Sequence, residues 1–144
     1  MKHRIALGFI LLTLGVLSPG IAGGKADLQK YFNDAALKVK ATADPVQKRA
    51  ILHESFRTMT KALDAVERMT PMSGEERAGL GHYQAALTEK QDELLGRNGY
   101  QRVTDGQLNA FSDYVVQDME QADQYITISL VAALLIVILL ILVF

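Results

Sequence analysis

The chain has 144 residues, with 15 Lys and Arg against 16 Asp and Glu, a formal net charge of −1 and no cysteine. The absence of cysteine excludes disulfide bonds, thiolate metal ligands, a thiol nucleophile and a lipid-modified cysteine. The charge balance conceals an asymmetry, because residues 27–68 carry eight basic and six acidic side chains whereas residues 69–125 carry four basic and ten acidic ones. A net acidic middle segment without interleaved aromatic residues also argues against nucleic acid as a partner.

Residues 1–24 have the organisation of a secretory signal peptide. A basic start precedes an apolar run at residues 5–17, and small residues follow it. We predict that the segment is cleaved, after Ala22 or Ala26. The alternative is an uncleaved second membrane anchor, since residues 5–22 would measure about 27 Å as a helix at ~1.5 Å per residue.

Residues 126–144 are predicted to form a transmembrane helix. They contain no charged residue, and Thr127 and Ser129 carry their only polar side chains. As a helix they would measure about 28 Å, which is close to the ~30 Å thickness of the hydrocarbon core of a bilayer. The alternative is a buried core helix, which would need more protein around it.

Together the two ends predict a single-pass membrane protein whose residues 25–125 lie outside the cytoplasm, with the bacterial periplasm as the expected compartment. No cytoplasmic signalling domain is expected on this chain. A signal peptide followed by a terminal apolar tail is also the layout of a GPI attachment signal, with Ala110 and Ser112 as its small residues. Phe111 and Tyr114 crowd that site, so we favour the membrane-spanning interpretation.

Apolar spacing and capping residues predict four helices in residues 25–125 and give almost no strand signal. The first is expected at residues 26–43, and the second follows Asp44 as N-cap and Pro45 and ends near Met69. Its narrow apolar stripe is typical of helix bundles and coiled coils. The third begins at a capping box formed by Ser73 and Glu76 and ends at Gly96.

A second capping box, formed by Thr104 and Gln107, starts the last predicted helix. No Gly or Pro follows Gln107, so we expect one rod about 57 Å long that continues into residues 126–144. The predicted fold class is therefore all-α, a small antiparallel bundle of about four helices whose last helix continues into a C-terminal transmembrane helix.

The sequence contains no pattern that predicts catalysis. His53 and Glu54 resemble the start of a zinc-protease motif, but Arg57 stands where the second histidine is required. A metal site would need His82, on another predicted helix, to approach His53. The glycines and serines lack the strand and turn contexts of nucleotide-binding loops and nucleophile elbows. We therefore expect no enzyme, no catalytic or metal-binding residue and no cofactor.

One polar pattern is well defined. Arg49, His53, Arg57 and Lys61 recur every fourth residue of the second predicted helix, and we call these four residues the cationic ridge. The ridge is a candidate contact for an anionic partner, such as lipid head groups, an envelope polymer or an acidic protein face. The alternatives are packing against the acidic second half of the bundle, with Asp113, Asp118 or Glu120 as neighbours, or simple exposure to water.

These observations predict a non-enzymatic, membrane-anchored extracytoplasmic helical protein that serves as an adaptor or accessory subunit of a cell-envelope or membrane complex. Its expected partners are the lipid bilayer and a membrane or envelope protein, or a second copy of itself. The alternative is a ligand-sensing helical bundle that signals through a membrane partner, an analogy that rests on architecture alone.

Overall fold

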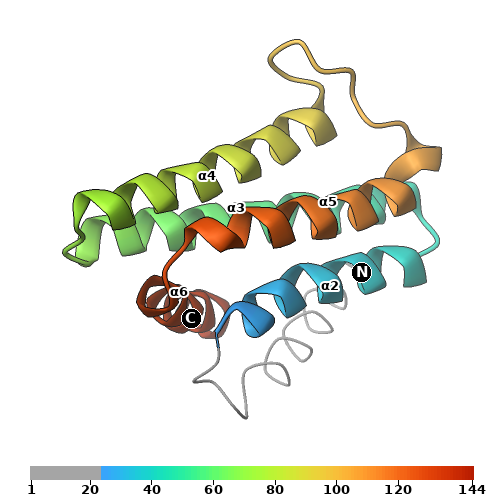
Figure 1. Ribbon diagram of the computed structural model, residues 1–144. Helices are drawn as coiled ribbons and strands as arrows, with labels where there is room; N and C mark the ends of the chain where they lie inside the picture. The colour runs from blue at the N-terminus through green and yellow to red at the C-terminus, as the bar shows by residue number, and fades with distance from the viewer. Residues whose placement is uncertain (1–23) are drawn as a thin grey trace.

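This computed structural model describes residues 24–144 of the chain (Figure 1). Within them the chain forms five α-helices and two short 3-10 turns. Their bounds are α2 Lys25–Ala41, α3 Pro45–Met69, α4 Gly74–Leu95, α5 Leu108–Ala122 and α6 Ile128–Val143, and the 3-10 turns are η1 Asp105–Gln107 and η2 Asp123–Tyr125. The predicted all-α class is confirmed. The predicted signal peptide at residues 1–24 lies, except for Gly24, outside the described residues.

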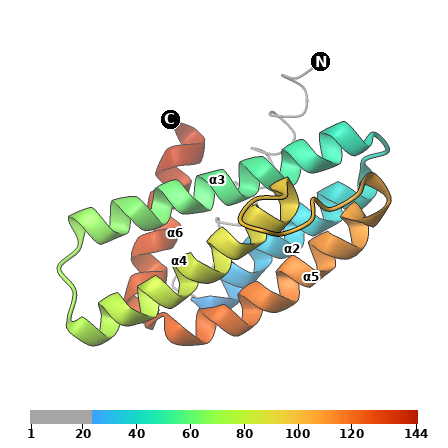
Figure 2. The same ribbon diagram turned by 90° about the horizontal axis from the view of Figure 1, so that it is seen from above.

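Helices α2 to α5 lie side by side with successive helices running in opposite directions, which confirms the antiparallel bundle (Figures 1 and 2). Helix α6 crosses beneath them and packs mainly on α3 and also on α2. The core is apolar and runs through all five helices; its most deeply buried large side chains include Leu52, Phe56, Met59, Leu63, Leu80, Leu87, Leu94, Leu108 and Met119.

The helix starts follow the capping residues that the sequence predicts. The side chain of Asp44 accepts a hydrogen bond from the amide of Val46 at 3.0 Å, with Pro45 in the first turn of α3. Ser73 and Glu76 form a reciprocal capping box at the start of α4. At the end of α4, Gly96 adopts φ 74°, a left-handed conformation that favours glycine.

The predicted rod from Gln107 into residues 126–144 is wrong. The second capping box exists, but it starts the short turn η1 rather than a long helix. Helix α5 ends at Ala122, η2 follows, and the backbone of Ile126 is extended. Thr127 then caps α6 by accepting a hydrogen bond from the amide of Leu130. Tertiary packing, described below, interrupts a segment whose local sequence contains no helix breaker.

Helix α6 contains no charged residue, but it is only 16 residues long. Among the helices of residues 24–144, none combines the length and the apolar character needed to cross a membrane. Five side chains of α6 are buried against the bundle: Leu130, Val131, Leu134, Leu135 and Ile138.

Two buried tyrosines in the core differ in how their hydroxyl groups are satisfied. The hydroxyl of Tyr31 donates a hydrogen bond to the carbonyl of Ser55 at 2.8 Å, whereas the hydroxyl of Tyr83 has no partner among residues 24–144. Burial, together with the nearby Asp123 carboxylate, raises the pKa of Tyr83 well above 10.0.

The two tyrosines should therefore respond oppositely to loss of the hydroxyl group. We expect Tyr31→Phe to lower the free energy of unfolding by about 1 kcal/mol, because it leaves the Ser55 carbonyl without that hydrogen bond. Tyr83→Phe should leave stability unchanged or raise it by up to about 1 kcal/mol, since it removes a desolvated and unpaired group. Urea unfolding of both variants measures the difference, and a greater loss for Tyr83→Phe would contradict the expectation.

Candidate interaction surface

The cationic ridge lies on α3, on the side of the helix that faces away from the core. His53, Arg57 and Lys61 are exposed, but the side chain of Arg49 is only 12% exposed. The four residues share a helix face as their spacing predicts. They nevertheless divide into three solvent-facing groups and one group that is held by the protein.

Arg49 joins α3 to the loop between α4 and η1. Its guanidinium donates to the carbonyls of Leu94 at 3.1 Å and Val103 at 2.8 Å, and it pairs with Asp105 at 2.9 Å. An arginine guanidinium carries five N–H donors in a rigid, planar arrangement, which suits a site with several acceptors at fixed angles. Arg49 thus fixes the end of α4 and the return of the loop rather than presenting a free charge.

We expect Arg49→Ala to lower the free energy of unfolding by roughly 2 kcal/mol, because it leaves two backbone carbonyls without their charged donor. Arg49→Lys keeps the charge but not the fork, and it should recover only part of the loss. The exposed Arg57 serves as the matched control, and Arg57→Ala should change stability by less than about 0.5 kcal/mol. Equal losses for Arg49→Ala and Arg57→Ala in chemical denaturation would contradict the assigned role.

Of the three predicted acidic neighbours of the ridge, Asp113 and Asp118 are paired with other residues, and Glu120 is exposed. Asp113 of α5 contacts Lys40 at 2.7 Å, and Asp118 of α5 contacts Lys90 at 2.7 Å. Within the described residues, Arg57 forms an ion pair with Glu54 of its own helix at 3.7 Å, and both side chains are more than half exposed. Such a pair contributes little to stability. The outer part of the ridge therefore presents His53, Arg57 and Lys61 to solvent and not to the acidic half of the bundle.

A shallow pocket of about 390 Å³ opens beside the ridge. Its lining includes Arg49, His53, Arg102 and Asp105 together with apolar side chains. His82, the other histidine of the described residues, lies on α4 and stacks on Tyr125 with ring centroids 4.5 Å apart. Within residues 24–144 no group of three or more His, Asp or Glu is placed to hold a metal ion.

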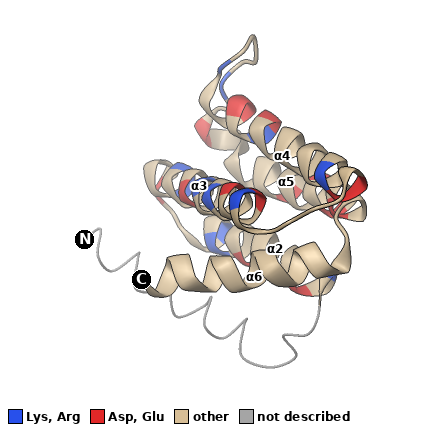
Figure 3. Cartoon of the chain, turned by 90° about the vertical axis from the view of Figure 1, so that its left-hand side faces the viewer, with Lys and Arg blue, Asp and Glu red and all other residues tan. Residues whose placement is uncertain are grey.

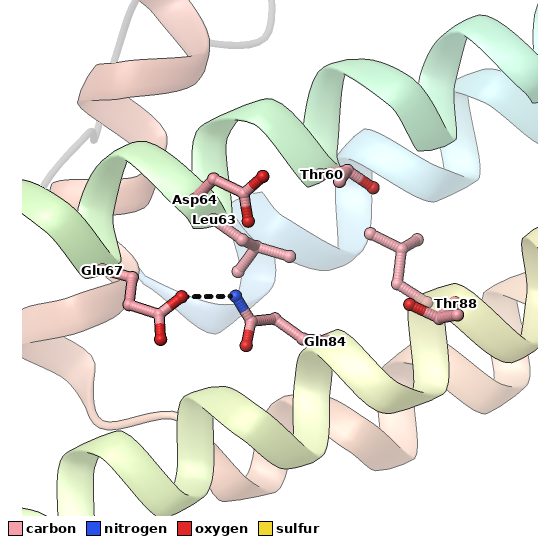
Figure 4. A pocket seen from close by; sticks show the side chains of 7 residues that line it. Thr60, Leu63, Asp64, Glu67, Gln84 and Thr88 are labelled. Carbon is pink, nitrogen blue, oxygen red and sulfur yellow. Dashed lines mark hydrogen bonds between the residues drawn. The ribbon is translucent and has the colours of Figure 1, made fainter.

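A second open pocket, of about 290 Å³, lies between α3 and α4. Figure 4 shows Asp64 and Glu67 of α3 facing Gln84 and Thr88 of α4 across it, with a hydrogen bond of 3.2 Å from Gln84 to Glu67. Leu63 and Leu87 contribute apolar lining. The polar part of the lining consists of two carboxylates, two hydroxyl groups and one amide, from Asp64, Glu67, Thr60, Thr88 and Gln84.

The most enclosed charge is Lys90 of α4, whose side chain is 0% exposed. Its ammonium contacts Asp118 at 2.7 Å and Glu89 and Glu93 at 3.4 Å each, and it lies 3.1 Å from the hydroxyl of Tyr114. Burial alone would lower the pKa of Lys90, but the hydrogen bonds to Asp118 and Tyr114 and the nearby carboxylates outweigh it and raise the pKa. Lys90 remains charged and joins α4 to α5.

The face of α6 that points away from the bundle is apolar and exposed. Ile136, Leu140 and Val143 are each at least half exposed, and Phe144 is 97% exposed. In Figure 2 the C-terminal end of α6 projects past α3. In Figure 3 α6, which has no charged residue, lies beneath α3, which carries several Lys and Arg residues. An apolar helix end thus lies next to the helix that carries the cationic ridge.

The junction between α5 and α6 is packed closely on α4. The carbonyl of Tyr125 lies where a Cβ atom on Gly79 would be, so that position allows no side chain. Asp123 is 2% exposed and accepts a hydrogen bond from Gln29 of α2 at 2.9 Å. The bundle therefore fixes the chain up to Ile126, which is itself buried.

No family model, curated protein or solved structure matches this chain. Sequence reasoning placed the cationic ridge on one face but missed the partners of Arg49, which come from a loop far away in the chain. It also missed the Lys90 cluster, in which Glu93 lies three residues from Lys90 on α4 but Asp118 comes from α5. Gly79 offered a weak signal, since glycine inside a helix costs about 1 kcal/mol relative to alanine.

Proposed function

We propose that this protein is a non-enzymatic, membrane-anchored helical bundle that acts outside the cytoplasm as an adaptor or accessory subunit of a cell-envelope or membrane complex. Helix α6 is the membrane anchor, and the exposed ridge residues His53, Arg57 and Lys61 meet anionic head groups or an acidic partner. The observation that carries the proposal is the outer face of α6, which exposes Ile136, Leu140 and Val143 on a helix without a charged side chain, and the exposed Phe144 that follows it.

The physical reasoning concerns where such a face is stable. Exposed apolar surface of this kind is costly in water and marks a contact with protein or membrane. Burying one such side chain contributes about 1.5–3 kcal/mol when the burial is complete. A nearby lysine or arginine adds about 1 kcal/mol of attraction to an anionic membrane surface. An apolar helix end beside a cationic helix therefore matches the acyl chains and head groups of an anionic bilayer.

Vesicle flotation tests the proposal. We expect the full chain to float with phosphatidylglycerol-containing vesicles, and the double variant Ile136→Glu with Leu140→Glu to remain in the aqueous fraction while keeping its helical circular dichroism. The control is Leu37→Glu on α2, an equally exposed apolar position, which should still float. If all variants fail to float, or if the double variant floats, the proposal that α6 is the membrane anchor is wrong.

The ridge has its own expected effect in the same assay. Arg57→Gln and Lys61→Gln should each weaken binding to anionic vesicles about fivefold and leave binding to neutral vesicles unchanged, since each removes about 1 kcal/mol of head-group attraction. Arg49 is left intact because it fixes the α4–η1 loop. If the two substitutions leave anionic binding unchanged, the ridge faces something other than lipid.

A protein partner is the other part of the proposal. Cross-linking in native membranes followed by mass spectrometry should recover a stable partner, and recovery of monomer alone would contradict the adaptor role.

The alternative, a ligand-sensing bundle, is favoured by one observation, the open pocket lined by Asp64, Glu67 and Gln84. A ligand-dependent shift of the amide signals of those residues in NMR would favour sensing over adaptation.

A further inference from the structure

Helix α6 has two apolar faces with different surroundings. Its inner face buries Leu130, Leu134 and Ile138 among others, whereas its outer face leaves Ile136 and Leu140 exposed. A helix that is hydrophobic all round suits an environment that surrounds it completely. The position beneath α2 and α3 satisfies only the inner half, and a bilayer would satisfy both.

At the start of α6 the chain passes from a buried segment to an exposed one. On the bundle side, Asp123 and Ile126 are buried, and Tyr125 packs on the backbone of Gly79. Beyond this fixed end, Thr127, Ile128 and Ser129 are all exposed. Their side-chain contacts are mostly local: the Thr127 hydroxyl accepts a hydrogen bond from the amide of Leu130 at 3.4 Å and lies 3.2 Å from the Ser129 hydroxyl, which is 3.5 Å from Glu76. Residues 127–129 therefore form the point at which α6 can turn with the least loss of contact.

We propose that α6 exchanges between two positions, one packed beneath α2 and α3 as described here and one buried in a lipid bilayer, by turning about residues 127–129. The proposal rests on the proposed function, because it assigns α6 as the membrane anchor. In the packed position the bundle shields half of the anchor, and in the membrane position the surface of α2 and α3 beneath α6 becomes available to another partner.

Transfer between the two positions changes the surroundings of both faces of α6 and of the bundle surface beneath it. On transfer, the inner side chains of α6 exchange protein contacts for acyl chains, and the outer side chains exchange water for acyl chains. Against this, the surface of α2 and α3 that α6 covers becomes exposed. Helix α6 is about 24 Å long at ~1.5 Å per residue, shorter than the ~30 Å hydrocarbon core, so the bilayer must thin locally around it. Cationic groups on the neighbouring α3 would hold the bundle at the head groups during the exchange.

Distance measurement between spin labels tests the exchange. The chain has no cysteine, so two introduced cysteines are unique labelling sites. The reporting pair is Ala50→Cys on α3 with Val143→Cys on α6, and the control pair is Ala50→Cys with Leu37→Cys on α2; all three sites are exposed. Both pairs are measured in the full chain, in buffer and on phosphatidylglycerol-containing vesicles, with flotation recorded on the same samples.

We expect the reporting pair to lengthen on vesicles by about 10 Å or more, because turning a helix ~24 Å long about its first turn moves its far end by a comparable distance. The control pair should not change. Flotation with both distances unchanged would overturn the exchange while leaving the proposed membrane association intact. Lengthening of both pairs would mean that the bundle itself opens, which also overturns it. Absence of flotation would instead contradict the proposed function.

Discussion

Replacing Lys90 by methionine is expected to lower the free energy of unfolding by about 3 kcal/mol, more than any other substitution considered for this protein. The ammonium of Lys90 is 0% exposed and lies 2.7 Å from Asp118 and 3.4 Å from Glu93. Methionine fills a similar volume but leaves Glu89, Glu93 and Asp118 as neighbouring carboxylates without their shared cation. Because Asp118 is 31% exposed, water relieves part of this repulsion, so the loss lies at the lower end of the range for a broken buried pair.

The control separates the ion pair from simple packing. Asp118→Asn removes the shortest partner, and Lys90→Met should cost less in the Asp118→Asn background than in the wild type if the two residues act together. Urea unfolding monitored by circular dichroism gives all four free energies. Additive losses, or a Lys90→Met variant within about 0.5 kcal/mol of the wild type, would show that the cluster does not stabilise the junction of α4 and α5.

The Lys90 cluster also makes the free energy of unfolding depend on pH in the alkaline range. The pKa of Lys90 is raised above 10.5, so its stabilising effect is fully present below pH 10.5 and is lost as the pH rises through the raised value. The buried Tyr31 and Tyr83 also have raised pKa values, and their ionisation in the unfolded state acts in the same direction. Lys90→Met should therefore weaken the loss of stability above pH 10.5 without abolishing it.

Local signals in the sequence predicted the elements whose ends depend on neighbouring residues. The Asp44 cap and the Ser73 and Glu76 box begin α3 and α4 where expected, because each satisfies backbone groups within four residues. The signals failed at the end of α5, where the interruption depends on contacts with α2 and α4. Gln29 and Gly79 are both distant from Asp123 and Tyr125 in the sequence, so no periodicity within residues 107–144 could reveal them.

The cationic ridge shows the same division between local and distant information. The four-residue spacing correctly predicted a shared face of α3, since that follows from helix geometry alone. It could not separate Arg49 from the exposed residues, because the carbonyl partners of Arg49 come from Leu94 and Val103. Which face of α6 is exposed could not be predicted from the sequence either. Residues 126–144 are apolar throughout, so their order does not say which side faces the bundle.

The second large effect is expected at Gly79. A methyl group at this position would overlap the carbonyl of Tyr125, which belongs to the backbone rather than to a flexible side chain. Overpacking of this kind costs about 1–3 kcal/mol, and the gain in helix propensity from alanine offsets at most about 1 kcal/mol of it. We expect Gly79→Ala to lower the free energy of unfolding by about 2 kcal/mol and to increase amide hydrogen exchange at residues 123–127.

Gly81 provides a matched control two residues away on the same helix. A Cβ atom there meets nothing within 4 Å, so Gly81→Ala should raise stability by about 0.5–1 kcal/mol through helix propensity alone. The opposite signs of the two substitutions distinguish close packing of the α5–α6 junction from a general effect of glycine in α4. If both variants are stabilised equally, Tyr125 does not press on Gly79, and the fixed end from which α6 is proposed to turn is absent. If only Gly79→Ala loses stability, the junction anchors residues up to Ile126, and movement of α6 must begin beyond it.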